Sequence, residues 1–124
     1  MARLTIRVVF GEAAAVGPGK IALLEAIAES GSISAAGRAL KMSYRRAWTL
    51  VEELNALFRT PLVRARPGGA QGGGAQVTAL GKLVVREYRA LEALLREDGQ
   101  PHVAALEHAV RRARRGSVVI SRRT

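Results

Sequence analysis

The sequence predicts an α+β fold that is mainly helical. Apolar residues recur at intervals of three and four along most of the chain, which is the spacing of one buried helix face. Other segments are rich in β-branched or alternating apolar residues, as strands are. A glycine-rich stretch, residues 67–74, separates two of these strand-like segments. These three observations place a small β component within a helical domain.

The composition is that of one globular domain. With 124 residues, 48% of them hydrophobic, the chain can bury one core but not two. No apolar run reaches the roughly 20 residues of a membrane span, and we expect no signal peptide and a cytoplasmic protein. The absence of cysteine excludes disulfides and thiolate metal sites. We expect His102 and His108 to be solvated, so no metal and no cofactor is predicted.

Charge is the most informative bulk property. Twenty Lys and Arg residues against ten Asp and Glu residues give a net charge of +10 and an isoelectric point near 11.5. Seventeen of the twenty are arginine, whose planar guanidinium suits phosphates and guanine edges. Such a balance favours a polyanionic partner, usually nucleic acid. A genome of high GC content, which encodes arginine in place of lysine, would leave the same composition.

The beginning of the chain predicts one strand and one helix. Leu4–Phe10 is β-branched and partly alternating, so it predicts a strand that ends at Gly11. Gly17–Gly19 predicts a loop, with Pro18 well placed for the first turn of the helix that follows. From Lys20 onward apolar residues recur at three and four until Gly31, which predicts an amphipathic helix.

Two helices joined by a tight turn are predicted next. The first is short, Ala35–Leu40, and either Ser32 or Ser34 offers its hydroxyl as the N-cap. Ser43 is the expected cap of the second helix, which runs from Tyr44 to Phe58.

On the second helix, apolar and polar residues lie on opposite sides. The apolar side consists of Ala47, Leu50, Val51, Leu54, Leu57 and Phe58. Arg45, Thr49 and Glu52 lie opposite, with Arg46 and Trp48 on the two flanks. Two short helices in close succession, the second with an arginine-bearing polar face, are typical of a helix-turn-helix.

A glycine-rich hairpin is predicted after these helices. Leu62–Arg66 alternates as a half-buried strand should, and Ala75–Thr78 can return as its partner. The glycine-rich residues 67–74 between them cannot pack and predict a mobile tip. After a helix-turn-helix such a hairpin is a wing, and Arg64 and Arg66 would carry it onto DNA. A disordered linker is the alternative, because glycine runs also make linkers.

The remainder predicts a long helix and a basic extension. Ala79–Glu97 carries an apolar stripe, and we expect this helix to pair two subunits. Asp98–Pro101 predicts a break in the helix. The chain is therefore divided into a winged helix-turn-helix domain, residues 1–97, and a short basic C-terminal extension, residues 98–124.

Within the extension, His102–Arg115 can form one more short helix and Ser117–Ser121 is strand-like. Its arginines would either extend a DNA footprint or form a solvated face.

Several of these segments resemble one family in order and in spacing. They are Leu23–Ile27, Ser30–Ala36, Met42–Trp48, Leu54–Asn55, and the glycine-rich Gly68–Ala75 with Thr78 and Gly81. Together they are similar to the winged-helix domain of the ModE-type, molybdate-responsive transcriptional regulators, over roughly Lys20 to Leu95. The wider resemblance is to LysR-type regulators, whose DNA-binding domains resemble the Gly-Ser-Ile-Ser-Ala-Ala stretch.

The resemblance implies a homodimer that binds operator DNA, regulates transcription and pairs its subunits through the long helix. Full-length family members carry C-terminal oxyanion-binding domains that sense molybdate. About 29 residues follow Leu95, too few for such a domain, so we expect no molybdate binding by this chain.

The predicted DNA-binding residues surround the turn, the second helix and the wing. They are Ser34, Arg38, Ser43, Tyr44, Arg45, Arg46, Thr49, Arg64 and Arg66. Arg45 lies most squarely opposite the apolar side and can donate two hydrogen bonds to guanine O6 and N7. Glu52 either accepts from cytosine N4 or is solvated. We expect Trp48 to pack under the wing or the neighbouring helix, with DNA contact as the alternative.

No catalytic residue is predicted. The sequence has no Ser, His and carboxylate cluster, and its glycine run lacks the context of a phosphate-binding loop. We therefore predict a sequence-specific DNA-binding protein and not an enzyme. Two alternatives are a protein–protein adaptor that pairs with a separate sensor subunit, and a nucleoid-type protein that binds DNA without sequence preference.

Overall fold

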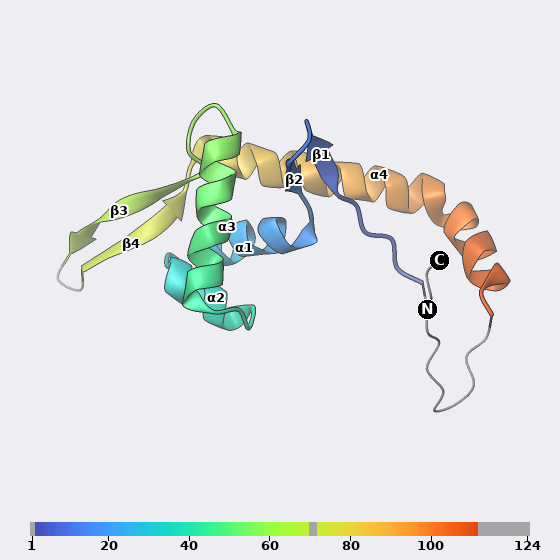
Figure 1. The fold of residues 1–124 in the computed structure, drawn as a ribbon, viewed down its shortest axis with the longest axis horizontal. Coiled ribbons are helices and arrows are strands. Elements are labelled where there is room, and N and C mark those ends of the chain that lie inside the picture. Colours follow the sequence, from blue (N-terminus) through green and yellow to red (C-terminus); the bar gives the residue numbers. More distant parts are fainter. Residues whose placement is uncertain (1, 70–71, 112–124) are drawn as a thin grey trace.

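The computed structural model describes residues 2–69 and 72–111, and it confirms a mainly helical α+β fold. Within these residues the elements are, in chain order, β1 (Val8–Phe10), β2 (Ala14–Val16), α1 (Pro18–Ser30), α2 (Ile33–Ala39), α3 (Tyr44–Leu57), β3 (Val63–Gly69), β4 (Gly72–Val77) and α4 (Ala79–Ala109). Helices α1, α2 and α3 gather at one end of the molecule (Figure 1). The β3–β4 hairpin projects beyond α3, and α4 extends in the opposite direction past the β1–β2 hairpin.

The N-terminal segment differs from the prediction of a single strand, Leu4–Phe10. The strand β1 is shorter, and it pairs antiparallel with β2 so that Val8 lies opposite Val16. Gly11 turns the chain between them with a φ of 66°, a conformation that favours glycine. The sequence did not predict β2, because alanine has little intrinsic preference for strands. In the structure, pairing with β1 stabilises this strand despite that low preference.

Serine hydroxyls begin both helices of the predicted pair. The Ser32 Oγ accepts a hydrogen bond from the Ala35 N–H at 3.0 Å, so Ser32 rather than Ser34 caps α2. The Ser43 Oγ accepts from the Arg46 N–H at 3.0 Å and begins α3, as predicted. The two helices approach closely at Gly37, where an added Cβ would lie 3.1 Å from the Cβ of Ala47. The helix-turn-helix is thus capped at both starts and tightly packed.

The core lies between these helices and the base of the β3–β4 hairpin. Helix α1 supplies four buried apolar side chains to it, and α3 contributes the buried part of its predicted apolar side. The buried residues of the two helices are Ile21, Leu23, Leu24, Ile27, Ala47, Leu50, Val51 and Leu54. Leu57 and Phe58, predicted on the same side of α3, are only partly buried at its end.

Helix α4 corrects the predicted break at Asp98–Pro101. The helix runs on to Ala109, with Gly99 and Pro101 inside it. Proline removes one backbone hydrogen bond and kinks a helix rather than ending it when strong helix formers flank it on both sides. The final part of α4 accordingly bends away from the line of its first part (Figure 1). The division at residue 97 stays a prediction, and residues 112–124, with the strand-like Ser117–Ser121, lie outside the described residues.

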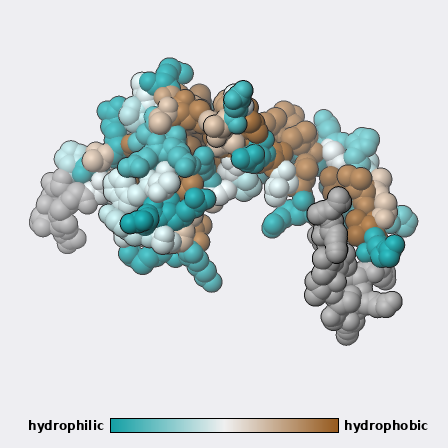
Figure 2. Space-filling view, in the orientation of Figure 1, coloured by the Kyte–Doolittle hydropathy of each residue, from teal (hydrophilic) through white to brown (hydrophobic). Residues whose placement is uncertain are grey.

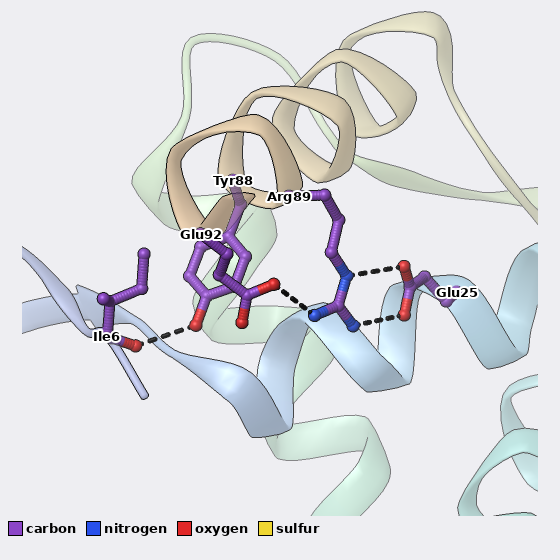
Figure 3. A network of polar contacts seen from close by, with 5 residues as sticks. All are labelled: Ile6, Glu25, Tyr88, Arg89 and Glu92. Atoms are coloured by element: carbon purple, nitrogen blue, oxygen red, sulfur yellow. Dashed lines mark hydrogen bonds and ion pairs between the residues drawn. The ribbon is translucent and has the colours of Figure 1, made fainter. Parts of the chain in front are cut away.

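A polar network fastens α4 to α1 and to the N-terminal segment (Figure 3). The Arg89 guanidinium donates to both carboxylate oxygens of Glu25, at 2.9 and 2.7 Å, and to the buried Glu92 at 2.7 Å. The Tyr88 hydroxyl donates to the Ile6 carbonyl at 2.7 Å. The hydrogen bonds from Arg89 hold the pKa of Glu25 below its ordinary value, whereas burial raises the pKa of Tyr88. Through these contacts, α4 is held in a fixed position relative to the helix-turn-helix.

Candidate nucleic-acid interface

Helix α3 presents the polar face that the sequence predicted. Arg45 and Glu52 are exposed, and Thr49 between them is half-buried. Arg46 lies on one flank, in a hollow shared with Arg7 and with an ion pair between Lys20 and Glu53, whose Nζ–Oε1 distance is 3.2 Å. Tyr44 and Trp48 lie toward the other flank and face the β3–β4 hairpin. Of the predicted residues of α3, Arg45 and Thr49 therefore lie on the outward face, Arg46 on one side and Tyr44 on the other.

The turn between α2 and α3 brings three more predicted residues, Ser34, Arg38 and Ser43, to the same end of the molecule as Tyr44. Arg38 donates to the Ser34 Oγ at 3.1 Å along the exposed side of α2. Ser43 uses its oxygen as the cap of α3, which leaves its hydroxyl proton free to donate. Tyr44 begins α3 and is 61% exposed. Two serine hydroxyls and the Arg38 guanidinium thus lie around the exposed start of α3.

The β3–β4 hairpin confirms the predicted wing. Val63 pairs with Val77 and Arg64 with Gln76, and the pairing continues as far as Gly69 opposite Gly72. The predicted tip, residues 67–74, is therefore partly strand, because a backbone ladder needs no side chains. Residues 70–71 of that tip lie outside the described residues.

Asn55 joins the wing to α3, a role that sequence reasoning missed. Its Oδ1 accepts from the N–H groups of Leu62 and Val63 at 2.8 and 3.1 Å, and its Nδ2 donates to the Val63 carbonyl at 3.0 Å. The sequence did contain a signal for this role, because Asn55 is a polar residue on the apolar side of α3, near the end of the helix. This one side chain fixes where β3 begins relative to α3.

A second junction fixes the wing against the end of α1. The Gly31 carbonyl accepts from the Ala75 N–H at 2.9 Å and from the Arg66 Nη2 at 3.4 Å. An added Cβ on Gly74 would lie 2.6 Å from that carbonyl oxygen, so only glycine fits there. Arg66, predicted to contact DNA, thus makes a contact within the protein while its side chain stays exposed.

A groove of about 380 Å³ separates α3 from the wing. Tyr44 and Trp48 line one wall, Arg64 and Ala65 line the wing side, and Ser34 is among the lining residues from α2. The rings of Tyr44 and Trp48 meet edge to face with centroids 6.1 Å apart. Trp48 is 39% exposed and lines this groove, so it is not buried under the wing or the neighbouring helix as expected.

The arginines of this surface have no carboxylate partner in the described part of the chain. This holds for Arg38, Arg45, Arg46, Arg64 and Arg66. Of the cations on α1 and α4, Lys20, Arg86 and Arg89 pair with carboxylates, whereas Lys82 and Arg96 do not pair with any among the residues that the structure describes. The surface formed by α2, α3 and the wing therefore carries uncompensated positive charge.

Two features are absent from residues 2–69 and 72–111, the part of the chain that the structure describes. No group of three His, Cys, Asp or Glu side chains among them is arranged to hold a metal ion. None of the helices described is both long enough and apolar enough to cross a lipid bilayer.

Comparison with known families identifies the helix-turn-helix. The model of the bacterial regulatory helix-turn-helix proteins, lysR family, matches residues 19–82, just over half of the chain. The chain belongs to this family. The matched segment contains all of α1 except its first residue, together with α2, α3 and the wing, and it ends in the first turn of α4. All nine predicted DNA-binding residues lie within this lysR-family segment.

Individual relatives confirm the resemblance to ModE-type proteins. The chain is 46% identical over 80 residues to the molybdenum-pterin-binding protein MopB of Rhodobacter capsulatus, covering 64% of this chain and 30% of that protein. It is 47% identical over 73 residues to the molybdenum transport protein ModE of Azotobacter vinelandii, covering 59% and 27%. It is 41% identical over 71 residues to the DNA-binding transcriptional dual regulator ModE of Escherichia coli K12, covering 57% and 27%. The match thus spans less than a third of each of these relatives.

Proposed function

We propose that this chain binds duplex DNA with sequence preference as a homodimer and thereby regulates transcription. The observation that carries the proposal is the group of arginines on α2, α3 and the wing that lack carboxylate partners among the described residues. Duplex DNA is a dense line of phosphates, and each cation placed on it releases condensed counterions. Arginines already paired within the protein would contribute far less.

The start of α3 is suited to read base edges in the major groove. Arg45 is exposed on the outward face and can donate two parallel hydrogen bonds to guanine O6 and N7. Thr49 lies one turn further on the same face and can donate or accept through its hydroxyl. Ser34, Arg38 and Ser43 surround this start and are placed for phosphate contacts that fix the register.

The wing would lie on the neighbouring backbone or in the minor groove. Arg64 and Arg66 are exposed on β3, and the two junctions at Asn55 and Gly31 hold that strand in place. A wing fixed in this way is already ordered before DNA binds, which lowers the entropic cost of binding.

An exposed apolar stripe on α4 supports the dimer. Leu83, Leu91, Leu94 and Leu95 are 38–59% exposed, and their spacing puts them on one helix face. Brown, hydrophobic atoms follow the line of α4 in Figure 2. A second copy of the same stripe is the simplest surface to cover it, and a two-fold pair would present two reading helices to successive major grooves.

The names of the relatives support DNA binding, and some of them mention molybdenum. The Escherichia coli relative is named a DNA-binding transcriptional dual regulator, and other relatives carry molybdenum in their names. The matched segment is the helix-turn-helix part of the chain. We expect molybdate added to this chain to leave its DNA affinity unchanged.

The test is a binding titration with genomic DNA. Fluorescence anisotropy would compare genomic fragments with random duplex of equal length over a salt series. We expect at least one fragment to bind more tightly than random duplex, with affinity falling steeply as salt rises. Equal affinity for every fragment would favour a nucleoid-type protein. No binding at low salt would refute DNA binding and favour an adaptor.

A further inference from the structure

The groove between α3 and the wing has a mixed chemistry that base reading does not explain. Trp48 and Tyr44 give it one aromatic wall, and Ile33 and Val51 extend the apolar lining. Arg64 supplies a cation from the facing wing, and Ser34 supplies a hydroxyl. No carboxylate is among the described residues that line it. The lining thus offers both an apolar surface and donors for an anion.

The position of the groove limits what part of DNA can enter it. If α3 lies in the major groove and the wing lies beyond it, then the segment between them must be the ridge that separates two grooves of the duplex. That ridge is one sugar–phosphate strand. Its deoxyribose is the apolar part and its phosphates are the anionic part, so it matches both components of the lining.

The exposure of Trp48 supports this occupant. The indole is 39% exposed, its ring meets the ring of Tyr44 edge to face, and it shares the groove with Arg64, which has no carboxylate partner among the described residues. A large aromatic surface left open on a cationic face is typical of a binding surface. Trp48 lines the groove together with Arg64 of the wing, whereas Arg45 is not among the lining residues.

We propose that the groove between α3 and the wing holds the backbone of one DNA strand, with Trp48 against a deoxyribose and with Arg64 and Ser34 on the flanking phosphates. This proposal rests on the proposed DNA binding and adds a contact residue, Trp48, that does not read sequence. A sugar is present at every nucleotide, so the contact adds affinity equally on all sequences.

The chain offers a direct probe, because Trp48 is its single tryptophan. Acrylamide quenching of its fluorescence would be measured on the full chain, free and saturated with duplex. We expect DNA to reduce the quenching constant severalfold, because the strand covers the exposed part of the indole. If saturated complex and free protein are quenched equally, Trp48 is not in contact with DNA and the proposal is refuted.

Variants separate sugar contact from base contact. Trp48→Ala should weaken binding about tenfold, as expected for one lost apolar contact, on preferred and random duplexes alike. The salt dependence of DNA binding by Trp48→Ala should match that of the unaltered chain, because no charge is lost. Arg64→Ala should instead lower the slope of log K against log salt by about one. Trp48→Phe keeps an aromatic ring and should recover most of the affinity.

The outcomes distinguish this proposal from the one on which it rests. An unaltered chain that binds no duplex refutes both. A chain that binds, with Trp48→Ala changing the preference among base pairs, refutes the backbone contact and leaves DNA binding intact. If Trp48→Ala fails to fold by circular dichroism, the quenching experiment on the unaltered chain still decides.

Discussion

The side chain of Asn55, in the last turn of α3, holds the backbone of Val63, the first residue of the wing, by two hydrogen bonds of 3.0 and 3.1 Å. The same oxygen accepts from the Leu62 N–H. One amide therefore meets the hydrogen-bonding needs of two buried residues at the point where helix and wing diverge.

Replacing Asn55 should destabilise the protein and loosen the wing. In Asn55→Ala the N–H groups of Leu62 and Val63 are left without their partner, and a buried unsatisfied donor costs roughly 1–3 kcal/mol. Urea unfolding would measure this as a lower free energy of unfolding. Glu52→Ala, at an exposed site on the same helix, should change it by less than about 0.5 kcal/mol. Equal stability of the two variants would show that the Asn55 bonds do not hold the wing.

Two glycines of α4 should respond in opposite directions to alanine. A Cβ on Gly81 would lie 2.5 Å from the Leu62 carbonyl oxygen and 2.6 Å from Val77 Cγ1, so Gly81→Ala must push the helix away from the wing. We expect a loss of about 1–3 kcal/mol, as in other overpacked sites. Gly99 has nothing within 4 Å, and Gly99→Ala should gain roughly 0.5–1 kcal/mol through helix propensity. Thermal unfolding of both variants checks this; a Gly81→Ala protein as stable as Gly99→Ala would contradict the close packing.

The ion pair between Arg89 and Glu25 should make stability depend on pH. Because Arg89 lowers the pKa of Glu25 below its ordinary value of 4.5, the stabilisation is fully present above pH 4.5 and is lost as pH falls through the lower pKa of the folded state. Both side chains are 42% exposed, so the effect is at most about 1 kcal/mol. Glu25→Gln should therefore be less stable than the unaltered chain at pH 7, and the difference should shrink as pH falls below 4.5 and through the lower pKa of Glu25 in the folded state. Glu29→Gln, exposed on the same helix, should show no such dependence on pH.

The apolar stripe of α4 predicts how the dimer can be broken. Leu94 is 59% exposed, and Leu94→Glu would place a charge in the proposed interface. We expect this variant to be monomeric by light scattering at concentrations where the unaltered chain is dimeric. Ala93→Glu adds the same charge on another, exposed face of the helix and should leave the dimer intact. An unaltered chain that stays monomeric at high concentration would contradict the dimer itself.

Local signals predicted the helix-turn-helix well. Ser43 begins α3 because its hydroxyl caps the helix next to it, and the apolar side of α3 follows from spacing alone. The resemblance to ModE-type regulators and the wing were likewise correct. Contacts between distant residues were not predictable in this way. The pairing of β2 with β1 depends on strand register, and the Asn55 bonds depend on where β3 returns.

The local sequence did not predict that α4 continues through Gly99 and Pro101. Both residues weaken a helix, and together they predicted its end. The residues before and after them are strong helix formers, including several alanines, leucines and glutamates, and the helix bends at this point instead of stopping (Figure 1).

We propose that the outward face of α3 reads DNA sequence through Arg45. The most direct measurement is the affinity of Arg45→Ala for a preferred site and for a panel of duplexes that each change one base pair of it. Arg96→Ala, which removes the same charge from exposed α4, is the matched control. We predict that Arg45→Ala loses about 1–3 kcal/mol of discrimination at one base pair, while Arg96→Ala keeps the full pattern. Unchanged discrimination by Arg45→Ala at every position would contradict the assignment of this face as the reading surface.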